Sequence, residues 1–329
     1  MARILLTGAG FSRNWGGWLA NEVFESLIGG VDEHLRHLLW QSKRRGGGFE
    51  DALAELEQQV RLSGNDTVKK QLVDLQTAIV GVFNAMNEAF KRTQFERHPG
   101  NDIAFLVRTF LARFDAIFTL NQDLLLEQHY LDENISLAHS RKWSGWQLPG
   151  MKPFGPPPLV HDPVMIRTAM MTPDDPASFR EQPRLQPYYK LHGSTNWTGG
   201  GSAGGRLLIM GGNKAVEIGQ YPLLDWYHRQ FREYLLRASR LMIIGYSFSD
   251  AHINRAIIEA AKKKNIGIFI VDPAGVDVLN KQDPRHVQSA SELMAAVEPQ
   301  IVGASRRNFL SAFSGDSVEF DRVSKFFIN

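Results

Sequence analysis

The chain has 329 residues, of which 43% are hydrophobic and 22% charged, and its net charge of +2 at pH 7 is too mild to indicate direct binding of nucleic acid. It contains no cysteine, which excludes disulfides, thiol nucleophiles and cysteine-bound zinc. No apolar run reaches the ~20 residues of a membrane helix, and no secretory leader precedes the strand-like segment 3–7, so we expect a cytoplasmic protein without membrane contact.

Taken in chain order, short apolar strands alternate with helical patterns. A first strand at 4–7 ends in a glycine turn, and residues 31–113 then have the periodicity of several helices, the last at 103–113. The later strands are predicted at 116–120, 188–191, 207–210, 241–244 and 266–271. Helices are predicted at 124–130, 224–238 and from 251. Because the strands are continuously apolar and separated by helices, we predict an α/β fold with a Rossmann-like parallel sheet flanked by helices.

The remaining segments are interpreted as additions to this sheet within a single domain of residues 1–329. Residues 141–187 are rich in proline and are expected to be irregular, forming a lid or a partner surface. The predicted parts are a Rossmann core (about 1–30, 114–130 and 188–275), a helical insertion (31–113), a proline-rich insertion (141–187) and a helical C-terminal tail (285–329).

A polar cluster follows each main strand. The clusters are residues 8–12, 121–123, 192–193, 245–250 and 272. Since ligands of parallel sheets bind beyond the carboxyl ends of the strands, we expect these clusters to converge on one edge. The turn Gly8-Ala9-Gly10 would bring backbone N–H groups close to a pyrophosphate, although by itself it could equally be a plain strand–helix connection. No glycine-lysine phosphate loop of the NTPases is present.

Four motifs at these strand ends resemble, in order and placement, the signatures of the sirtuin superfamily. They are TGAGFS at 7–12, TLNQD at 119–123, LHG at 191–193 and GYS at 245–247. The longer block IGYSFSDAHIN at 244–254 is more similar to the sirtuin-like domains of bacterial antiviral defence systems than to the protein deacylases. The resemblance implies that the chain binds NAD⁺ as a substrate.

The resemblance also implies a role for each site residue. Asn121 would hold the ribose hydroxyls and an attacking water, Asp123 would bind the nicotinamide carboxamide, and His192 would act as general base. The remaining NAD contacts implied by the resemblance are Gly8, Ala9, Gly10, Phe11 and Ser12 at the phosphates and Gly245, Ser247 and Asp272 at the adenosine half. The residue types suit the chemistry, because departure of nicotinamide leaves an oxocarbenium-like ribose that needs positioned polar groups more than a strong nucleophile.

Several of these residues have a structural alternative. Asn121 could cap the following helix, and His192 could be a buried histidine before a glycine turn. Ser249 and Asp250 are equally suited to cap the helix that begins near 251. His252 and Asn254 could bind the nucleotide or only hold the turn in place, and the structural interpretation is preferred. His34 and His37 are interpreted as part of a helix surface without a metal.

The chain departs from the deacylase pattern at two places. Deacylating sirtuins have a four-cysteine zinc ribbon after the His-Gly motif, whereas residues 194–219 contain no cysteine. They also have a Pro-Asp-Phe-Arg segment after the glycine turn, where residues 14–18 are Asn-Trp-Gly-Gly-Trp. In that family the Pro-Asp-Phe-Arg segment lies near the nicotinamide, and the peptide channel lies between the zinc ribbon and the Rossmann lobe. The loss of the ribbon makes water the simpler acceptor, and we expect an NAD⁺ glycohydrolase without a metal.

Unregulated loss of NAD would kill a cell, so this hypothesis requires control. We expect a homo-oligomer or a partner, and related defence systems suggest a HerA-type ATPase or an Argonaute-like protein. The alternatives are a non-catalytic NAD or ADP-ribose sensor and a zinc-free deacylase or ADP-ribosyltransferase. A dehydrogenase is disfavoured, because Phe11-Ser12-Arg13 follows Gly10 where a third glycine and a downstream ribose-binding acid are expected.

Overall fold

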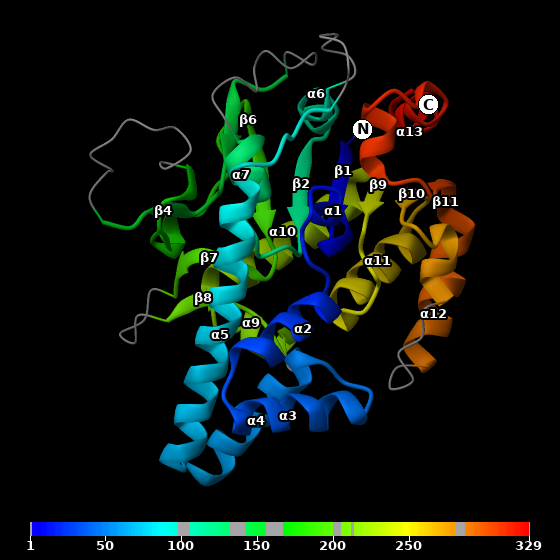
Figure 1. Ribbon diagram of the computed structural model, residues 1–329. Coiled ribbons are helices and arrows are strands. Elements are labelled where there is room, and N and C mark those ends of the chain that lie inside the picture. Colours follow the sequence, from blue (N-terminus) through cyan, green and yellow to red (C-terminus); the bar gives the residue numbers. More distant parts are fainter. Residues whose placement is uncertain are drawn as a thin grey trace.

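A seven-stranded parallel sheet forms the centre of the molecule (Figure 1). The computed structural model describes residues 2–97, 106–131, 142–155, 167–199, 205–211, 214–280 and 287–328. The strands lie in the order β11-β10-β9-β1-β2-β6-β3, and every neighbouring pair is parallel. Their bounds are β1 Ala2–Thr7, β2 Ala116–Thr119, β3 Gly145–Gln147, β6 Leu185–Lys190, β9 Ala238–Ile244, β10 Gly267–Val271 and β11 Ile301–Ser305. The predicted Rossmann-like parallel sheet is confirmed.

Helices cover this sheet. Three long ones follow one another along it, because α11 packs against both α10 and α12, and α10 also contacts β1 and β9. These are α10 Pro222–Arg237, α11 Ala251–Lys263 and α12 Val287–Val297. The shorter helices are α1 Ala9–Arg13, α6 Val107–Leu111, α7 Leu125–His129, α9 Lys214–Ile218 and α13 Ser317–Ser324. Turns of 3₁₀ helix are η3 Pro176–Ser178, η4 Gly275–Asn280, η6 Glu298–Gln300, η7 Phe309–Phe313 and η8 Lys325–Phe327.

A second, four-stranded sheet lies beside the first and has the order β4-β5-β7-β8. Its strands are β4 Met151–Pro153, β5 Met171–Pro173, β7 Gly193–Thr198 and β8 Arg206–Leu208. Strand β7 begins directly after His192, so the turn at this histidine connects the two sheets.

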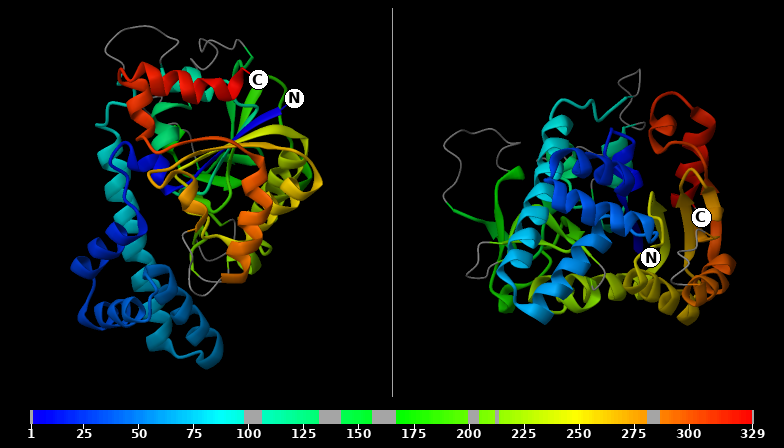
Figure 2. Two further views of the ribbon diagram at one scale, coloured as in Figure 1. Left: turned by 90° about the vertical axis from the view of Figure 1, so that its right-hand side faces the viewer. Right: turned by 60° about the horizontal axis from the view of Figure 1, so that its bottom comes forward.

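Four helices form a lobe of their own, here called the helical lobe (residues 20–90), which projects from the sheet in Figure 2. They are α2 Ala20–Gly30, α3 Glu33–Arg44, α4 Phe49–Ser63 and α5 Asp66–Phe90. Their apolar faces build a separate core that also takes in Leu208 and Met210. The far end of α5 returns to the main core with Met86 and Phe90, so this one helix belongs to both cores.

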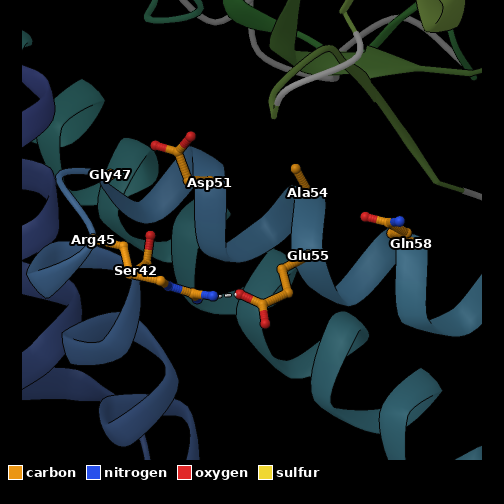
Figure 3. A pocket seen from close by; sticks show the side chains of 7 residues that line it. All are labelled: Ser42, Arg45, Gly47, Asp51, Ala54, Glu55 and Gln58. Carbon is orange, nitrogen blue, oxygen red and sulfur yellow. Dashed lines mark hydrogen bonds and ion pairs between the residues drawn. The ribbon is translucent and has the colours of Figure 1, made fainter. Parts of the chain in front are cut away.

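A hollow of about 420 Å³ lies in the helical lobe, beside the end of α3 and along α4 (Figure 3). Its lining includes the ion pair between Arg45 and Glu55. None of the lining residues belongs to the polar clusters that follow the sheet strands.

The structure corrects two expectations. In the described part of 141–187 the chain is not irregular, because it contributes β3 to the main sheet and β4 and β5 to the second. In the tail expected to be wholly helical, residues 301–305 form the edge strand β11. Both errors have the same cause: strands of three to five residues are too short to display a period. The helix expected at 103–113 is α6 at Val107–Leu111, with residues 103–105 outside the described part.

No helix among the described residues combines the length and the apolar character needed to cross a membrane.

Candidate functional site

The polar clusters meet where the direction of chain winding reverses. From the central β1 the chain proceeds to β2 and β6 on one side, and β9, β10 and β11 extend the sheet on the other. The loops on the second side are joined by backbone hydrogen bonds. Gly8 N donates to Ile244 O (3.0 Å), Gly10 N to Gly245 O (2.9 Å), and Gly245 N to Val271 O (2.9 Å). Such a switch point is the ordinary ligand site of an open parallel sheet.

Glycine is required where the loops after β1 and β9 approach each other. A Cβ on Gly8 would lie 2.6 Å from Gly245 O, and one on Gly10 would lie 2.7 Å from Gly245 Cα. Gly245 itself has a positive φ of 63°. Because the Gly8 and Gly10 amides already bond to the neighbouring loop, these glycines serve close packing of the two loops rather than presenting free N–H groups.

The other members of the first loop differ in exposure. Ala9 is exposed, whereas the Phe11 ring is buried against Trp15 and Phe309. Ser12 is buried and its Oγ accepts a hydrogen bond from Asn121 Nδ2 (2.9 Å). The side chain of Phe11 is therefore part of the core, and its backbone N–H already donates to Gly8 O (2.8 Å).

Asn121 links the loops after β1 and β2. Besides its contact with Ser12, its backbone N–H donates to Thr119 Oγ1 (3.0 Å). It does not cap α7, which begins at Leu125; instead Asp123 Oδ1 accepts from Leu125 N (3.0 Å). The capping alternative is therefore wrong for Asn121 and describes Asp123.

A buried ion pair holds the backbone of the Asn121 loop. Lys190, at the end of β6, is wholly buried, and its Nζ donates to Asp123 O (2.5 Å) and Glu127 Oε1 (2.7 Å). From the helical lobe, Asn87 Oδ1 accepts from Leu124 N (2.8 Å). Sequence analysis missed Lys190 and Asn87, since nothing in their local sequence marks them.

His192 lies beside the same loop, where β6 ends. Gln122 Nε2 donates to Ile209 O (2.5 Å) and more weakly to His192 O (3.5 Å), which connects the Asn121 loop to the histidine. His192 is 3% exposed, and its Nε2 lies 3.0 Å from Nε2 of His252. The structure thus brings Asn121, His192 and the glycine turn to one edge of the sheet.

His192 is one of three residues whose ligand-type atoms lie within 4.8 Å of one another, the others being Asp250 and His252. Asp250 does not cap α11 with its side chain. Its Oδ1 instead lies 3.0 Å from Nζ of Lys214, which also pairs with Glu50 (2.9 Å). A bound cation would have to share the Asp250 carboxylate with this ammonium, so we interpret the group as a charge-compensated, hydrogen-bonded cluster.

Burial controls the protonation of this cluster. It lowers the pKa of His192 well below the usual 6.5 and that of His252 to about 4. Burial also disfavours the Asp250 carboxylate, but the imidazole of His192 and the ammonium of Lys214 outweigh it and lower that pKa to about 2. At neutral pH the two imidazoles are therefore neutral and Asp250 is ionised.

The remaining predicted residues lie on the loops after β9 and β10. Ser247 is exposed and its Oγ lies 3.0 Å from Ser249 Oγ. Asp272 is buried and its Oδ1 accepts from Ala274 N (2.8 Å). Asn254 supports the turn, because its Nδ2 donates to Phe248 O (2.7 Å). The structural interpretation thus fits Asn254, whereas His252 contacts the proposed base.

Together, the parallel sheet, its switch point and the loops around it define a Rossmann-like α/β protein with polar loops at the carboxyl edge of the sheet. The family model described as a SIR2-like domain matches residues 115–293, more than half of the chain. The chain therefore belongs to the SIR2-like domain family. The matched range includes Asn121, His192 and Asp250 but not the glycine turn at 8–12.

Solved structures of Sir2 homologues are similar to the chain over almost its whole length. One is a Sir2 homologue in complex with NAD, at 14% identity, covering 99% of this chain and 90% of that one with a TM-score of 0.42. Another is a mutant Sir2 homologue in complex with 2′-O-acetyl ADP-ribose, at 14% identity, with 98% and 92% covered and a TM-score of 0.37. No curated protein sequence matches the chain.

Proposed function

We propose that the chain is an NAD⁺ glycohydrolase, which cleaves the bond between nicotinamide and ribose with water as the acceptor. The observation that carries the proposal is the meeting of Asn121 and His192 with the loop 8–12 at the switch point of the sheet, joined by the contact between Asn121 and Ser12. Membership of the SIR2-like family supports NAD as the ligand. The absence of cysteine, and hence of a zinc ribbon, favours water over a peptide acceptor.

The dinucleotide would lie along the carboxyl edge. We place its phosphates at the exposed Ala9 and at Ser12, with Gly8 and Gly10 allowing the loops to pack closely. Asp123 would face the nicotinamide carboxamide. On the other side of the switch point, the adenosine half would contact Gly245, Ser247 and Asp272, which follow β9 and β10.

The reaction needs few catalytic groups. The bond between ribose C1′ and the pyridinium nitrogen breaks, and nicotinamide leaves with the electron pair. A water held by the amide of Asn121 attacks C1′. His192 takes the proton that this water loses, so the products are nicotinamide, ADP-ribose and one proton. Because burial lowers the pKa of His192, its imidazole is neutral at physiological pH and able to act as a base.

Chromatography of NAD⁺ incubated with the full chain tests the proposal. Nicotinamide and ADP-ribose should appear in equal amounts. His192→Ala and Asn121→Ala should each lower kcat by roughly 10²–10⁴-fold, the usual contribution of a positioned acid–base group. As matched controls, His37→Ala and Asn21→Ala change exposed side chains in the helical lobe and should leave the rate unchanged.

The same incubation separates the alternatives. Tight NAD binding without turnover in any assembly state would identify a sensor. Transfer of label from NAD to protein would identify an ADP-ribosyltransferase, and loss of acyl groups from a peptide would identify a deacylase. Full activity in both active-site variants would refute the mechanism.

In the cell we propose that this activity depletes cytoplasmic NAD⁺ as an effector of antiviral defence, restrained by assembly of the chain or by a partner such as a HerA-type ATPase or an Argonaute-like protein. The specific activity should then rise with protein concentration or on addition of the partner. Expression of the wild type under activating conditions should deplete cellular NAD⁺, and expression of Asn121→Ala should not. A specific activity independent of both concentration and partners would contradict this form of control.

A further inference from the structure

A row of alternating charges runs from the helical lobe to His192. Glu50 of α4 lies 2.9 Å from Lys214 Nζ, and the same Nζ lies 3.0 Å from Asp250 Oδ1. Asp250 in turn lies within 4.8 Å of both imidazoles, whose Nε2 atoms are 3.0 Å apart. The row is best shielded near the histidines: the side chain of Asp250 is 12% exposed and that of Lys214 15%, whereas that of Glu50 is 39% exposed.

We propose that Asp250 and His252 are positioning residues for His192, and that the helical lobe holds Asp250 in place through Glu50 and Lys214. This inference rests on the proposed function, in which His192 is the base. It assigns a task to four residues that the mechanism above leaves unused.

The contact between the two imidazoles links their tautomers. A hydrogen bond between two Nε2 atoms needs one donor and one acceptor, so only one of the two nitrogens carries the hydrogen. The tautomer of His192 is therefore tied to that of His252, and the contact holds the orientation of the His192 ring.

Asp250 supplies the charge that a proton on His192 requires. The charged and titratable groups facing His192 are Asp250, Lys214, His252 and His228, of which Asp250 is the one that is negative. His252 is faced in addition by Arg232 and Arg255. In surroundings that are otherwise neutral or positive, the carboxylate of Asp250 stabilises the imidazolium that forms when His192 takes up the proton.

Lys214 and Glu50 tie this carboxylate to the helical lobe. Lys214 alone would neutralise Asp250 and weaken its effect on His192, but Glu50 shares the ammonium. If α4 shifted and the contact between Glu50 and Lys214 broke, Lys214 would pair with Asp250 alone. Asp250 would then stabilise a proton on His192 less, so the position of the helical lobe affects the basicity of His192.

Asp250→Asn in the full chain tests the proposal. We expect kcat for NAD⁺ cleavage to fall roughly 10–10²-fold with little change in KM. The acidic limb of the kcat profile should move to lower pH, because the substitution removes the group that raises the pKa of His192. Glu50→Gln should cause a smaller change in the same direction, and a thermal melt establishes that both variants are folded. The matched control Glu55→Gln alters a carboxylate on the same helix that pairs with Arg45 (Figure 3) and should change nothing.

A readout without turnover separates this proposal from the proposed function. Titration of the His192 ring by NMR should show a lower pKa in Asp250→Asn than in the wild type. A folded Asp250→Asn protein with the wild-type pH profile and the wild-type His192 titration overturns the positioning role. A wild type that releases no nicotinamide refutes the glycohydrolase proposal alone, since the NMR titration still decides the positioning role.

Discussion

At the scale of single residues, the Asn121 loop depends on an ion pair that water does not reach. The side chains of Lys190 and Glu127 are 0% and 1% exposed. Burial raises the pKa of Glu127, and Lys190 opposes that shift. Because the same ammonium also holds Asp123 O, the pair fixes the backbone directly after Asn121. Buried pairs are costly to break from one side, since the remaining charge has no partner.

Lys190→Met should therefore destabilise the protein by roughly 3–5 kcal/mol. The double variant Lys190→Met/Glu127→Leu removes both charges and should recover most of the loss in stability. Its NAD cleavage should stay impaired, because Asp123 O no longer has its donor. Urea unfolding and a kcat measurement on the same preparations check both statements. A single variant as stable as the wild type would show that the pair is not what holds the loop.

The pH dependence of the reaction is the second prediction at this scale. In the proposed mechanism the active form of His192 is neutral, and burial lowers its pKa well below 6.5. Activity should therefore be constant as the pH falls from about 8 to 6.5, and the acidic limb of kcat/KM should lie below the ordinary histidine value. A limb at or above pH 6.5 would contradict the assignment of His192 as the base, provided that the protein remains folded throughout.

The sequence marks some of the site residues better than others. Asn121 and His192 are conspicuous because each polar side chain directly follows an apolar strand. The sequence leaves the role of Asp250 open, because an acidic residue before a helix gives the same pattern whether it caps the helix or pairs with a lysine. Lys214 and Glu50 lie far apart in the chain, and their ion pair exists only because α4 of the helical lobe lies beside α9 in the folded protein. No local pattern encodes such a contact.

At the scale of elements, the contact between the loops after β1 and β9 restricts what can stand at the glycine turn. Gly8→Ala would place a methyl group 2.6 Å from Gly245 O and 2.8 Å from Tyr246 Cα. Both are backbone atoms, so the loops must separate. We expect a loss of roughly 1–3 kcal/mol in stability and a larger proportional loss of NAD cleavage.

Gly81→Ala is the matched control for this substitution. Gly81 is exposed within α5, and a Cβ there would meet no atom within 4 Å. The substitution should stabilise the protein by about 0.5–1 kcal/mol, the usual gain of alanine over glycine inside a helix, with unchanged activity. Thermal melting and a rate assay on the two variants are sufficient. Equal behaviour of the two variants would show that the loop contact is not tight.

The same scale shows how far the sequence predicts the fold. The inner strands β1, β2, β9 and β10 are predicted because each contains a continuous apolar run, and β6 is predicted from the tyrosine pair that precedes Lys190 and Leu191. The edge strands β3 and β11 were not, because an edge strand is short and partly exposed, and the helices around β11 have the stronger period. In the second sheet only β8 coincides with a predicted strand, the one at 207–210, whereas β4 and β5 have three residues each and the polar sequence of β7, Gly-Ser-Thr-Asn-Trp-Thr, has no apolar run.

At the scale of the whole molecule, two hydrophobic cores meet along α5. Leu75 and Ile79 belong to the core of the helical lobe, and Met86 and Phe90 to the core of the sheet. Two polar contacts join the helical lobe to the candidate site: Asn87 accepts from Leu124 N beside the Asn121 loop, and Glu50 pairs with Lys214, which pairs with Asp250. A change in how the lobe packs would therefore alter hydrogen bonds beside the site.

The buried His192 and His228 and the half-buried His252 give the fold a defined sensitivity to acid. The pKa of His192 is lowered well below 6.5 by burial, that of His252 to about 4, and that of His228 to about 3. In the unfolded chain each would titrate near 6.5. Protons therefore bind the unfolded state preferentially. The stability contributed by the neutral histidines is fully present above pH 6.5 and is lost as the pH falls from 6.5 toward the folded-state values.

His228 offers the sharpest test. Within the described part of the chain its ring bonds to one group, the carbonyl oxygen of Leu191 (2.9 Å), and glutamine can donate the same bond without titrating. Each buried histidine contributes a slope of up to ~1.4 kcal/mol per pH unit below 6.5. His228→Gln should lower the stability at pH 7 but flatten the fall between about pH 6.5 and 5, a range in which most carboxylates stay ionised. Urea unfolding at several pH values measures the slope, and the exposed His37→Gln should keep the wild-type slope. If His228→Gln loses stability with acid as steeply as the wild type, His228 is not neutral in the folded protein.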